Sequence, residues 1–383
     1  MKFNKFFMLA VAGLAMTACS SDEEVGSQLP KGVGAVSVRI ANPSMGRAVG
    51  AGNEAAVTVK AETDVVVTLE ADKGSGTYTF TADKWNSATT KEVKFWNVVN
   101  PKSITVTMNG GVVFYSADKS VADTDLQEVA NVPVYGEASN FTLSSEVENP
   151  NGDYQVGATP DDANKKYQMY KATVKLAIPV ARLEVGNIKH VAHTGEGDDN
   201  CKYKTLSIAG VYLDNVVPNG EGVKYENGAF SNATGTAVDY SFDGVNGTGV
   251  EAIFKDAIDE ANKNFLTPGA QWPTIETEVF GYNFFGCDAA KMPKFKIYFS
   301  ESASVNPDAP LPAPRYAMIT KYKNAEGAEL TAFEPGKIYR ITQAFLDDKN
   351  IIGDEGGNTM YGVTVTVEEA QWQPVNITAD WQE

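Results

Sequence analysis

Two positions in the chain carry residue types that suit covalent processing. Cys19 follows the small residues Thr17 and Ala18 and precedes a polar stretch. A cysteine in this arrangement, called a lipobox, has a thiol that can take up a diacylglycerol and become the new N-terminus. The second position is the bond between Arg47 and Ala48, which a trypsin-like protease can cut where the chain is exposed. Both are sites of modification, so neither predicts a reaction that the protein itself catalyses.

The residues before Cys19 have the layout of a secretory signal. Lys2 and Lys5 provide a positive head, and residues 6–16 form an apolar run. The run is too short to cross a membrane, which takes about 20 apolar residues. We therefore expect residues 1–18 to be a lipoprotein signal peptide. An ordinary signal peptide followed by a chance cysteine is the alternative.

A strand pattern lies between the lipobox and the arginine. Val36, Val38 and Ile40 alternate with polar residues, which is the period of a half-buried strand. Polar and small residues then break the pattern before Arg47. We expect residues 19–47 to form a lipidated propeptide that contains this strand. Most arginines in loops are only solvated, so the cleavage site depends on support from the rest of the chain.

The composition is that of an acidic globular protein. The chain has 383 residues and a formal net charge of −17, with 43% hydrophobic and 21% charged residues. Residues 1–47 carry a net charge of +2, so a chain that begins at Ala48 would carry −19 instead of −17. Nucleic-acid binding requires a basic surface, so the charge argues against it, and it also argues against docking on anionic lipid.

The remaining cysteines and the known catalytic motifs give little chemistry. Cys201 and Cys287 can pair in an oxidising compartment or remain two buried thiols, and their spacing does not decide between these states. The sequence contains no GxSxG, P-loop, HExxH or CxxC motif. We therefore expect a protein that is not an enzyme and that needs no cofactor.

Neither candidate metal site has a full set of ligands. His190 and His193 lack a nearby third ligand, so we expect no metal there. Asp348, Asn350 and Gly353 begin like a calcium loop, but the bidentate glutamate of such loops is missing. We interpret this stretch as the solvated tip of a hairpin.

Short strands dominate the chain after Ala48. Runs of β-branched and aromatic residues recur between turn residues, as is typical of a β-sandwich. Apolar residues spaced by three and four predict one amphipathic helix at residues 250–261. The fold class that we predict is all-β, with two immunoglobulin/transthyretin-like β-sandwich domains and a small inserted helix. Pro179 interrupts the longest run, so we expect domains at residues 48–178 and 179–383.

The final segment, about residues 371–383, is unusual. Val375, Ile377, Ala379 and Trp381 fall on one face of an extended strand, and Pro374 separates this strand from the preceding one. Trp372 begins the segment. A terminal strand with an apolar row must pair with a sheet edge in its own domain or in a neighbouring molecule. Both possibilities remain open from the residues alone.

Taken together in this order, these segments resemble the Bacteroidales fimbrillins, the shaft subunits of type V pili. The lipobox, the strand and the arginine site contribute to the resemblance, which spans nearly the whole chain. So do several loose motifs, namely VPVYGE (132–137), VARLEVGNI (180–188), IAGVYLDNV (208–216), FEPGKIYRI (333–341) and WQPVNITADW (372–381).

The resemblance implies a route of assembly. The precursor would be acylated at Cys19, with palmitate as one of its acyl chains, and carried through the outer membrane to the cell surface. An arginine-specific protease would cut after Arg47 and remove the strand that holds Val36, Val38 and Ile40. The tail of another copy would then act as donor strand, and tip and anchor subunits would be further partners in an adhesive fimbria.

Two other functions compete with this one. A tip or anchor subunit of the same family is the first, although the Arg47 site argues against an anchor and the tail favours a shaft subunit. A surface lipoprotein that binds glycan without polymerising is the second, because aromatic residues can stack on sugars. An N-terminus found at Cys19 rather than at Ala48 would favour the second.

Overall fold

The structure of the protein is a computed structural model. It describes residues 34–41, 44–45, 57–58, 61–88, 91–109, 132–148, 154–157, 167–186, 188–191, 203–244, 250–258, 265–266, 269–272, 280–304, 315–323, 328–341, 344–348, 351, 363–366 and 368–371. Cys19, the Arg47–Ala48 bond and the tail after Gln371 lie outside the described residues. So do Cys201 and His193.

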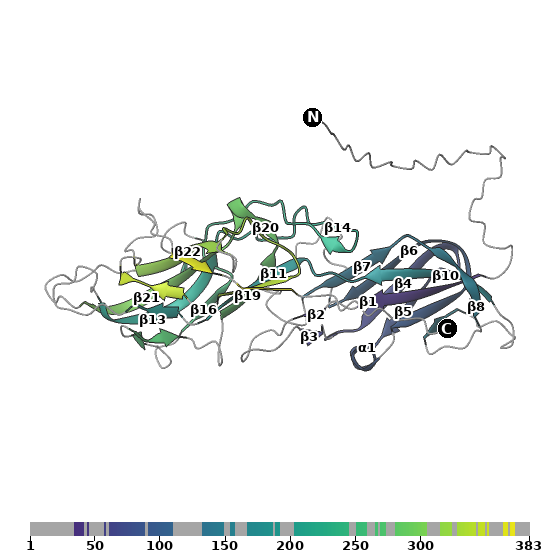
Figure 1. Cartoon of the computed structure of the whole chain (residues 1–383), viewed down its shortest axis with the longest axis horizontal. Helices are drawn as coiled ribbons and strands as arrows, with labels where there is room; N and C mark the ends of the chain where they lie inside the picture. The colour runs from purple at the N-terminus through teal and green to yellow at the C-terminus, as the bar shows by residue number, and fades with distance from the viewer. Residues whose placement is uncertain are drawn as a thin grey trace, which may run out of the picture.

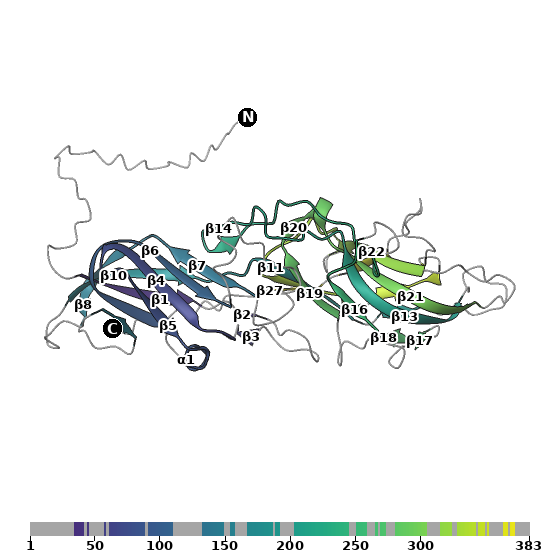
Figure 2. The same ribbon diagram turned by 180° about the vertical axis from the view of Figure 1, so that it is seen from behind.

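Two groups of strands follow one another along the longest axis of the molecule (Figures 1 and 2). Nearly all the regular structure is β, so the predicted all-β fold is confirmed. Strands β1 to β10 lie in the first group, and strands β11 to β27 lie in the second. The chain passes from one group to the other at residues 176–179, around Pro179.

The N-terminal group is a sandwich in which one long strand belongs to both sheets. Its strands are β1 (Gly34–Ala41), β2 (Ser44–Met45), β3 (Val57–Thr58), β4 (Val65–Lys73), β5 (Gly76–Phe80), β6 (Glu92–Met108), β7 (Val134–Ala138), β8 (Thr142–Glu148), β9 (Gln155–Val156) and β10 (Tyr167–Lys175). Sheet 1 contains β8, β10, β1, the first part of β6 and β9. Sheet 2 contains β5, β4, the second part of β6 and β7.

A kink in β6 allows this strand to change sheets. Asn97 and Asn100 have φ angles of 59° and 51°, in the left-handed region that asparagine tolerates better than most residues. The turn between β4 and β5 packs on this kink, because a Cβ atom on Gly74 would lie 2.4 Å from the carbonyl oxygen of Asn97. A side chain at Gly74 would therefore push the hairpin away from the corner of the sandwich.

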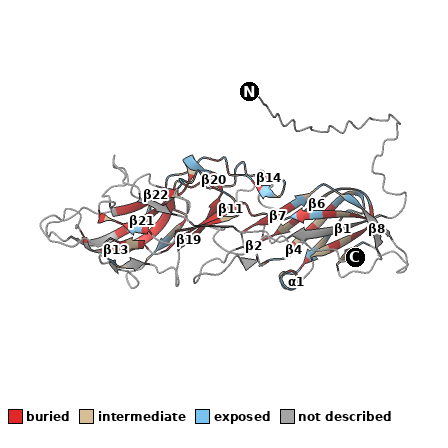
Figure 3. Cartoon of the chain, in the orientation of Figure 1, coloured by how far each residue is buried: buried red, intermediate tan, exposed pale blue. Residues whose placement is uncertain are grey.

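Apolar side chains of both sheets form the core of the N-terminal group. Helix α1 (Ala82–Ser87) closes one end of this core with Trp85, which is fully buried against Phe80 at a ring distance of 5.3 Å. Thr81 caps the helix, because its side chain accepts a hydrogen bond from the amide of Lys84. Figure 3 shows that the buried residues run along the inner strands of both groups.

The C-terminal group has two larger sheets and several short ones. Its elements are β11 (Val180–Val185), β12 (Ile188–His190), β13 (Tyr203–Asp214), β14 (Tyr225–Glu226), β15 (Ala229–Phe230), β16 (Lys255–Ala257), β17 (Phe265–Leu266), β18 (Gln271–Trp272), β19 (Phe280–Phe285), β20 (Cys287–Asp288), η4 (Ala289–Lys291), β21 (Lys294–Ser304), β22 (Arg315–Lys323), β23 (Ala332–Phe333), β24 (Lys337–Ile341), β25 (Ala344–Leu346), β26 (Val363–Thr366) and β27 (Glu368–Gln371). Sheet 3 has the order β19-β11-β24-β27, and sheet 4 has the order β16-β13-β21-β22-β26.

The predicted helix at residues 250–261 is wrong. Residues 250–258 contain no helical turn, and β16 within them pairs with β13 along the edge of sheet 4. Ala252 and Phe254 are buried at alternating positions, while Val250 is 44% exposed. The edge of β13 offers backbone partners, such as the 2.9 Å hydrogen bond from Leu213 N to Phe254 O, so tertiary pairing overrides the helical spacing.

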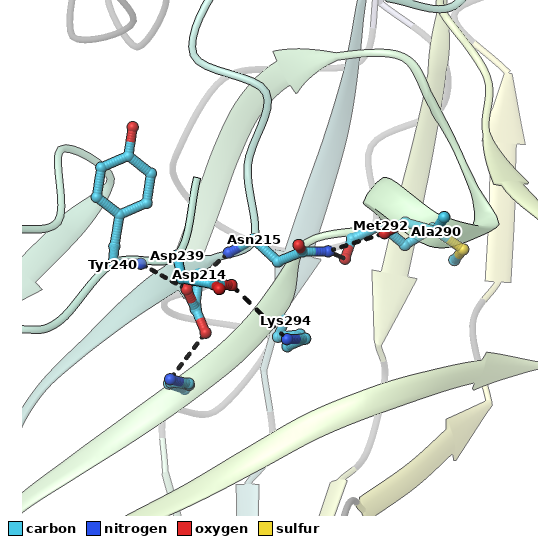
Figure 4. A network of polar contacts seen from close by, with 8 residues as sticks. Asp214, Asn215, Asp239, Tyr240, Ala290, Met292 and Lys294 are labelled. Carbon is cyan, nitrogen blue, oxygen red and sulfur yellow. Dashed lines mark hydrogen bonds and ion pairs between the residues drawn. The ribbon is translucent and has the colours of Figure 1, made fainter. Parts of the chain in front are cut away.

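A buried carboxylate fixes the corner where β13 ends. The Asp214 side chain accepts hydrogen bonds from the amides of Tyr240 (2.6 Å) and Asn215 (2.8 Å) (Figure 4). It also pairs with the Lys296 ammonium at 2.8 Å. Asp214 and Lys296 are both buried. Nearby, Asp239 pairs with Lys294 at 3.9 Å, but this carboxylate is 60% exposed.

The two neighbouring ion pairs give a matched test of stability. We expect Asp214→Ala to lower the free energy of unfolding by about 3–5 kcal/mol, because it leaves the Lys296 charge buried without its carboxylate. Asp239→Ala should change it by less than about 1 kcal/mol, as for other exposed pairs. Urea unfolding followed by tyrosine and tryptophan fluorescence measures both. Equal effects of the two substitutions would contradict the assignment.

Candidate strand-exchange site at β1

Strand β1 lies in the middle of sheet 1 and pairs along both of its sides (Figure 1). Residues 35–41 are in parallel register with residues 169–175 of β10. Residues 34–39 are in antiparallel register with residues 92–98 of β6. The strand that the sequence predicts at residues 36–40 is therefore present, and it is a central strand of its sheet.

We call a residue of β1, together with the residues that pair with it in β6 and β10, a register level. Every second level of β1 belongs to the core. Val36 pairs with Phe95 and Tyr170, and Val38 pairs with Val93 and Ala172. Ile40 pairs with Val174. All these partners are buried, and most of them belong to the hydrophobic core of the N-terminal sandwich. Residues opposite one another share a face of the sheet, so these three levels lie over the core.

The levels between them belong to the outer face of sheet 1, and the residues that pair with β1 there differ from one end of the strand to the other. Ala35 pairs with Trp96 and Met169, which form an apolar cluster of their own and are 1% and 0% exposed. At the other end, Ala41 pairs with Lys175, whose side chain is exposed. The outer face thus changes from buried and apolar to exposed and basic along the length of β1.

Loss of β1 would leave a defect with two components. The backbone N–H and C=O groups of β6 and β10 that now pair with β1 would face an open gap. Unpaired strand edges bind other extended segments readily. The core-facing side chains around this gap, such as Phe95 and Val174, would also lose their cover. An extended segment with alternating apolar residues would correct both components at once.

A polar hollow lies beside the C-terminal end of β1 and β10. It has a volume of about 540 Å³, and its lining includes Thr173 and Lys175 of β10, Glu137 of β7 and Asn227 of the β14–β15 turn. Two of these residues, Thr173 and Lys175, share register levels with Arg39 and Ala41 of β1.

The β14–β15 hairpin of the C-terminal group forms one wall of this hollow. Tyr225 Oη donates a hydrogen bond to Lys175 O at 2.5 Å, and the Tyr225 ring packs against Tyr135 of β7. Asn227 and Gly228 make the two-residue turn with φ angles of 55° and 90°, as a type I′ hairpin requires. The hairpin therefore connects β10, the neighbour of β1, to the C-terminal group.

The predicted hairpin tip at Asp348 is wrong. Asp348 is buried, and its carboxylate lies 2.6 Å from His190 Nε2 and accepts a hydrogen bond from the amide of Tyr203 at 3.1 Å. The parallel pairing of β12 with β25 brings His190 next to the end of β25. This contact spans 158 positions in the chain, and the local sequence of the loop contains nothing that would predict it.

Other candidate residues in the described part of the chain show no reactive chemistry. Cys287 is a buried free thiol, and burial raises its pKa to about 12. The described residues contain no group of three or more histidine, cysteine or acidic side chains placed to hold a metal ion. They also contain no helix that is long and apolar enough to cross a membrane.

The chain leaves the described structure from the edge of sheet 3. β26 pairs with β22 in sheet 4, and β27 pairs with β24 in sheet 3. Gln371, the last described residue, is in register with Lys337 at the start of β24. The amide of the preceding residue, Gly336, donates to Val180 O at 2.8 Å, so this point lies close to the junction of the two groups.

No protein-family profile and no curated protein sequence matches the chain. Similar solved structures include a fimbrilin from Porphyromonas gingivalis W83, which has a TM-score of 0.48 and 14% identity and aligns over 90% of this chain and 98% of its own. A candidate cell adhesion protein from Bacteroides eggerthii DSM 20697 has a TM-score of 0.47 and 16% identity, over 92% and 100% of the two chains. The C-terminally truncated tip fimbrial protein Mfa3 from Porphyromonas gingivalis has a TM-score of 0.36 and 11% identity, over 89% and 99%.

These solved structures are of the same class, Bacteroidales fimbrial and cell adhesion proteins, that the sequence resemblance indicates.

Proposed function

We propose that the protein is a shaft subunit of an adhesive fimbria that polymerises by strand exchange. The precursor is exported as a lipoprotein, acylated at Cys19 and then cut between Arg47 and Ala48. The cut releases β1 from the N-terminal sandwich, whose residues we propose as 48–178. The tail of a second copy then enters the gap, and repetition of this contact produces a filament, because a head-to-tail contact that does not close is open-ended.

The central place of β1 in sheet 1 is the observation that carries this proposal. Arg47 lies only a few residues after Ala41, so a cut there would separate β1 from the chain that forms the rest of the sheet. An edge strand would leave one unpaired neighbour, whereas β1 would leave two. The resulting gap is long enough to select an extended segment of similar length.

The tail has the residue pattern that such a gap requires. Val375, Ile377 and Ala379 repeat the alternation of Val36, Val38 and Ile40. Burial of the Val375 and Ile377 side chains contributes on the order of 3–6 kcal/mol, and the Ala379 methyl group adds about 1 kcal/mol, before the entropy of ordering the tail. The partners of this subunit would be other copies of itself, tip and anchor subunits and an arginine-specific protease at the cell surface.

The N-terminus of the subunit in assembled filaments tests the proposal. Filaments are sheared from cells that produce the full chain, and the mass and N-terminal sequence of the subunit are determined. We expect a chain that begins at Ala48 and carries no lipid. A subunit that begins at acylated Cys19, or filaments that lack this chain, would overturn the proposal. An acylated N-terminus on a monomeric protein would instead favour a surface lipoprotein.

A further inference from the structure

We infer that the exchanged tail runs in the same direction as β1, parallel to β10, with Asp380 beside Lys175 of the accepting copy. This inference rests on the proposed function, and it specifies which way and in which register the tail of a second copy binds. The three core levels of β1, at Val36, Val38 and Ile40, are the positions that the apolar row of the tail must occupy.

The three aliphatic residues alone do not determine the direction. In the same direction as β1, Val375, Ile377 and Ala379 occupy the levels of Val36, Val38 and Ile40. In the opposite direction, the same three residues occupy these levels in reverse order. Ile377 takes the central level in both cases, and the outer two levels exchange valine for alanine. The difference in packed volume is therefore small, about one or two methyl groups at each level.

The residues on either side of this row do determine the direction. Pro374 and Asp380 take the outer-face levels at the two ends of the row, namely the levels of Ala35 and Ala41. In the same direction as β1, Asp380 lies beside Lys175, which is exposed at the rim of the polar hollow. Opposite charges then meet at a solvated site, where the carboxylate keeps its hydration.

In the opposite direction, Asp380 takes the level of Ala35. Its neighbours there are Trp96 and Met169, which are 1% and 0% exposed. A carboxylate placed between two buried apolar side chains loses its hydration, and without a partner this costs several kcal/mol. When the tail runs in the same direction as β1, Pro374 takes the level of Ala35 instead. Proline suits this level, because it is apolar and because the register of β1 against β6 is already irregular between Gly34 and Ala35.

A slipped register is also disfavoured. If the tail ran opposite to β1 and were shifted by two residues, Asp380 would take the level of Ser37, between Lys94 and Lys171. The same shift places Trp381 at the level of Val36, between Phe95 and Tyr170. An indole ring in the place of a valine side chain overpacks this part of the core. If the tail ran in the same direction as β1 and were shifted by two residues toward the start of β1, Asp380 would take the level of Arg39. Its carboxylate would then lie beside that of Glu92, which is unfavourable.

The hollow supports the chosen direction as well. Residues 381–383 would continue past Lys175 into the space lined by Thr173, Asn227 and Glu137. The Glu137 carboxylate, on the neighbouring strand β7, lines the same hollow and already accepts a hydrogen bond from Tyr135 Oη at 3.1 Å. Lys175 is the cation in the lining of this hollow, and it shares the register level of Ala41 that Asp380 would take, so the geometry assigns it to Asp380.

Cysteine pairs in the full chain distinguish the two directions. Thr173 is exposed and pairs with Arg39 of β1, so Thr173→Cys should leave the sandwich intact, and it keeps both Lys175 and Asp380. One double variant combines it with Thr378→Cys, which takes the level of Arg39 in the same direction as β1. The other combines it with Asn376→Cys, which takes that level in the opposite direction. Neighbouring strand positions are close enough for a disulfide. Each variant is assembled under reducing conditions and then oxidised, and covalent oligomers are counted on a non-reducing gel. Cys287 should not interfere, because it is buried and its pKa is raised to about 12.

We expect a ladder of covalent oligomers from the Thr173→Cys/Thr378→Cys pair and at least about tenfold fewer from the Thr173→Cys/Asn376→Cys pair. The reverse result, or filaments that form with neither crosslink, would overturn the assigned direction while leaving strand exchange intact. Failure of the parent chain and of both variants to form filaments would overturn the proposed function itself, and with it this inference. The single Thr173→Cys variant is the control for crosslinks that involve any other cysteine.

Discussion

Arg47→Ala is expected to reduce filament formation by about a thousandfold and to leave an acylated, monomeric precursor at the cell surface. In this variant β1 remains attached to the sheet that it completes. A segment tethered by a short linker has an effective concentration in the millimolar range, whereas free subunits would be at about micromolar concentrations. The tail of another copy would therefore lose the competition for the gap, even if it bound as tightly as β1.

A rescue experiment separates the loss of cleavage from any other role of Arg47. Arg47→Ala is combined with the recognition site of an unrelated protease inserted into the same loop. Addition of that protease should restore filaments, as counted by electron microscopy of sheared material. Filaments built from the uncut Arg47→Ala chain would show that removal of β1 is not the trigger.

The sequence predicts the strands of this fold well where one face is buried and the register is local. The recurring β-branched runs predict short strands, and one of these runs forms β4, in which Val65, Val67 and Leu69 are buried. Pro179 also separates β10 from β11, as the sequence suggests. These features depend on residue types that favour strands and on a proline that interrupts one, and both are visible in any short window of sequence.

Features that depend on distant partners could not be predicted. Residues 250–258 have the apolar spacing of a helix, but the edge of β13 supplies backbone hydrogen bonds to them. Asp348 looks like a loop residue until β12 and β25 pair in parallel and bring His190 to it. A local pattern contains no information about which long-range pairing will compete with it, so tertiary contacts decided both cases.

The candidate site could also be predicted only in part from the sequence. The alternation of Val36, Val38 and Ile40 predicts a strand but does not tell whether the strand is central or at an edge. Only the pairing with both β6 and β10 shows how much of sheet 1 depends on it. The outer-face contrast between the Trp96–Met169 cluster and Lys175 likewise appears only in the assembled sheet, although it gives the strongest constraint on an incoming strand.

Deletion of residues 372–383 is expected to abolish donation while leaving both cleavage and the gap intact. The truncated subunit can still accept a tail from a second copy, so it should terminate growing filaments. Mixed with intact subunits, it should shorten filaments in proportion to its share of the mixture, as measured by electron microscopy. Filaments of unchanged length at an equal mixture would contradict a donor role for the tail.

Two point substitutions provide a sharper version of this prediction, because they differ only in the face of the strand that they alter. Ile377→Asp places a carboxylate at the central core level, between Val93 and Ala172, both of which are buried. A buried carboxylate without a partner costs several kcal/mol, so assembly should fall by at least about a hundredfold. Asn376→Asp adds the same charge at the adjacent outer-face level, that of Ser37 beside Lys94 and Lys171, and should reduce assembly by less than about tenfold. Equal losses for the two variants would mean that the tail does not bind as an alternating strand over the core of the N-terminal sandwich.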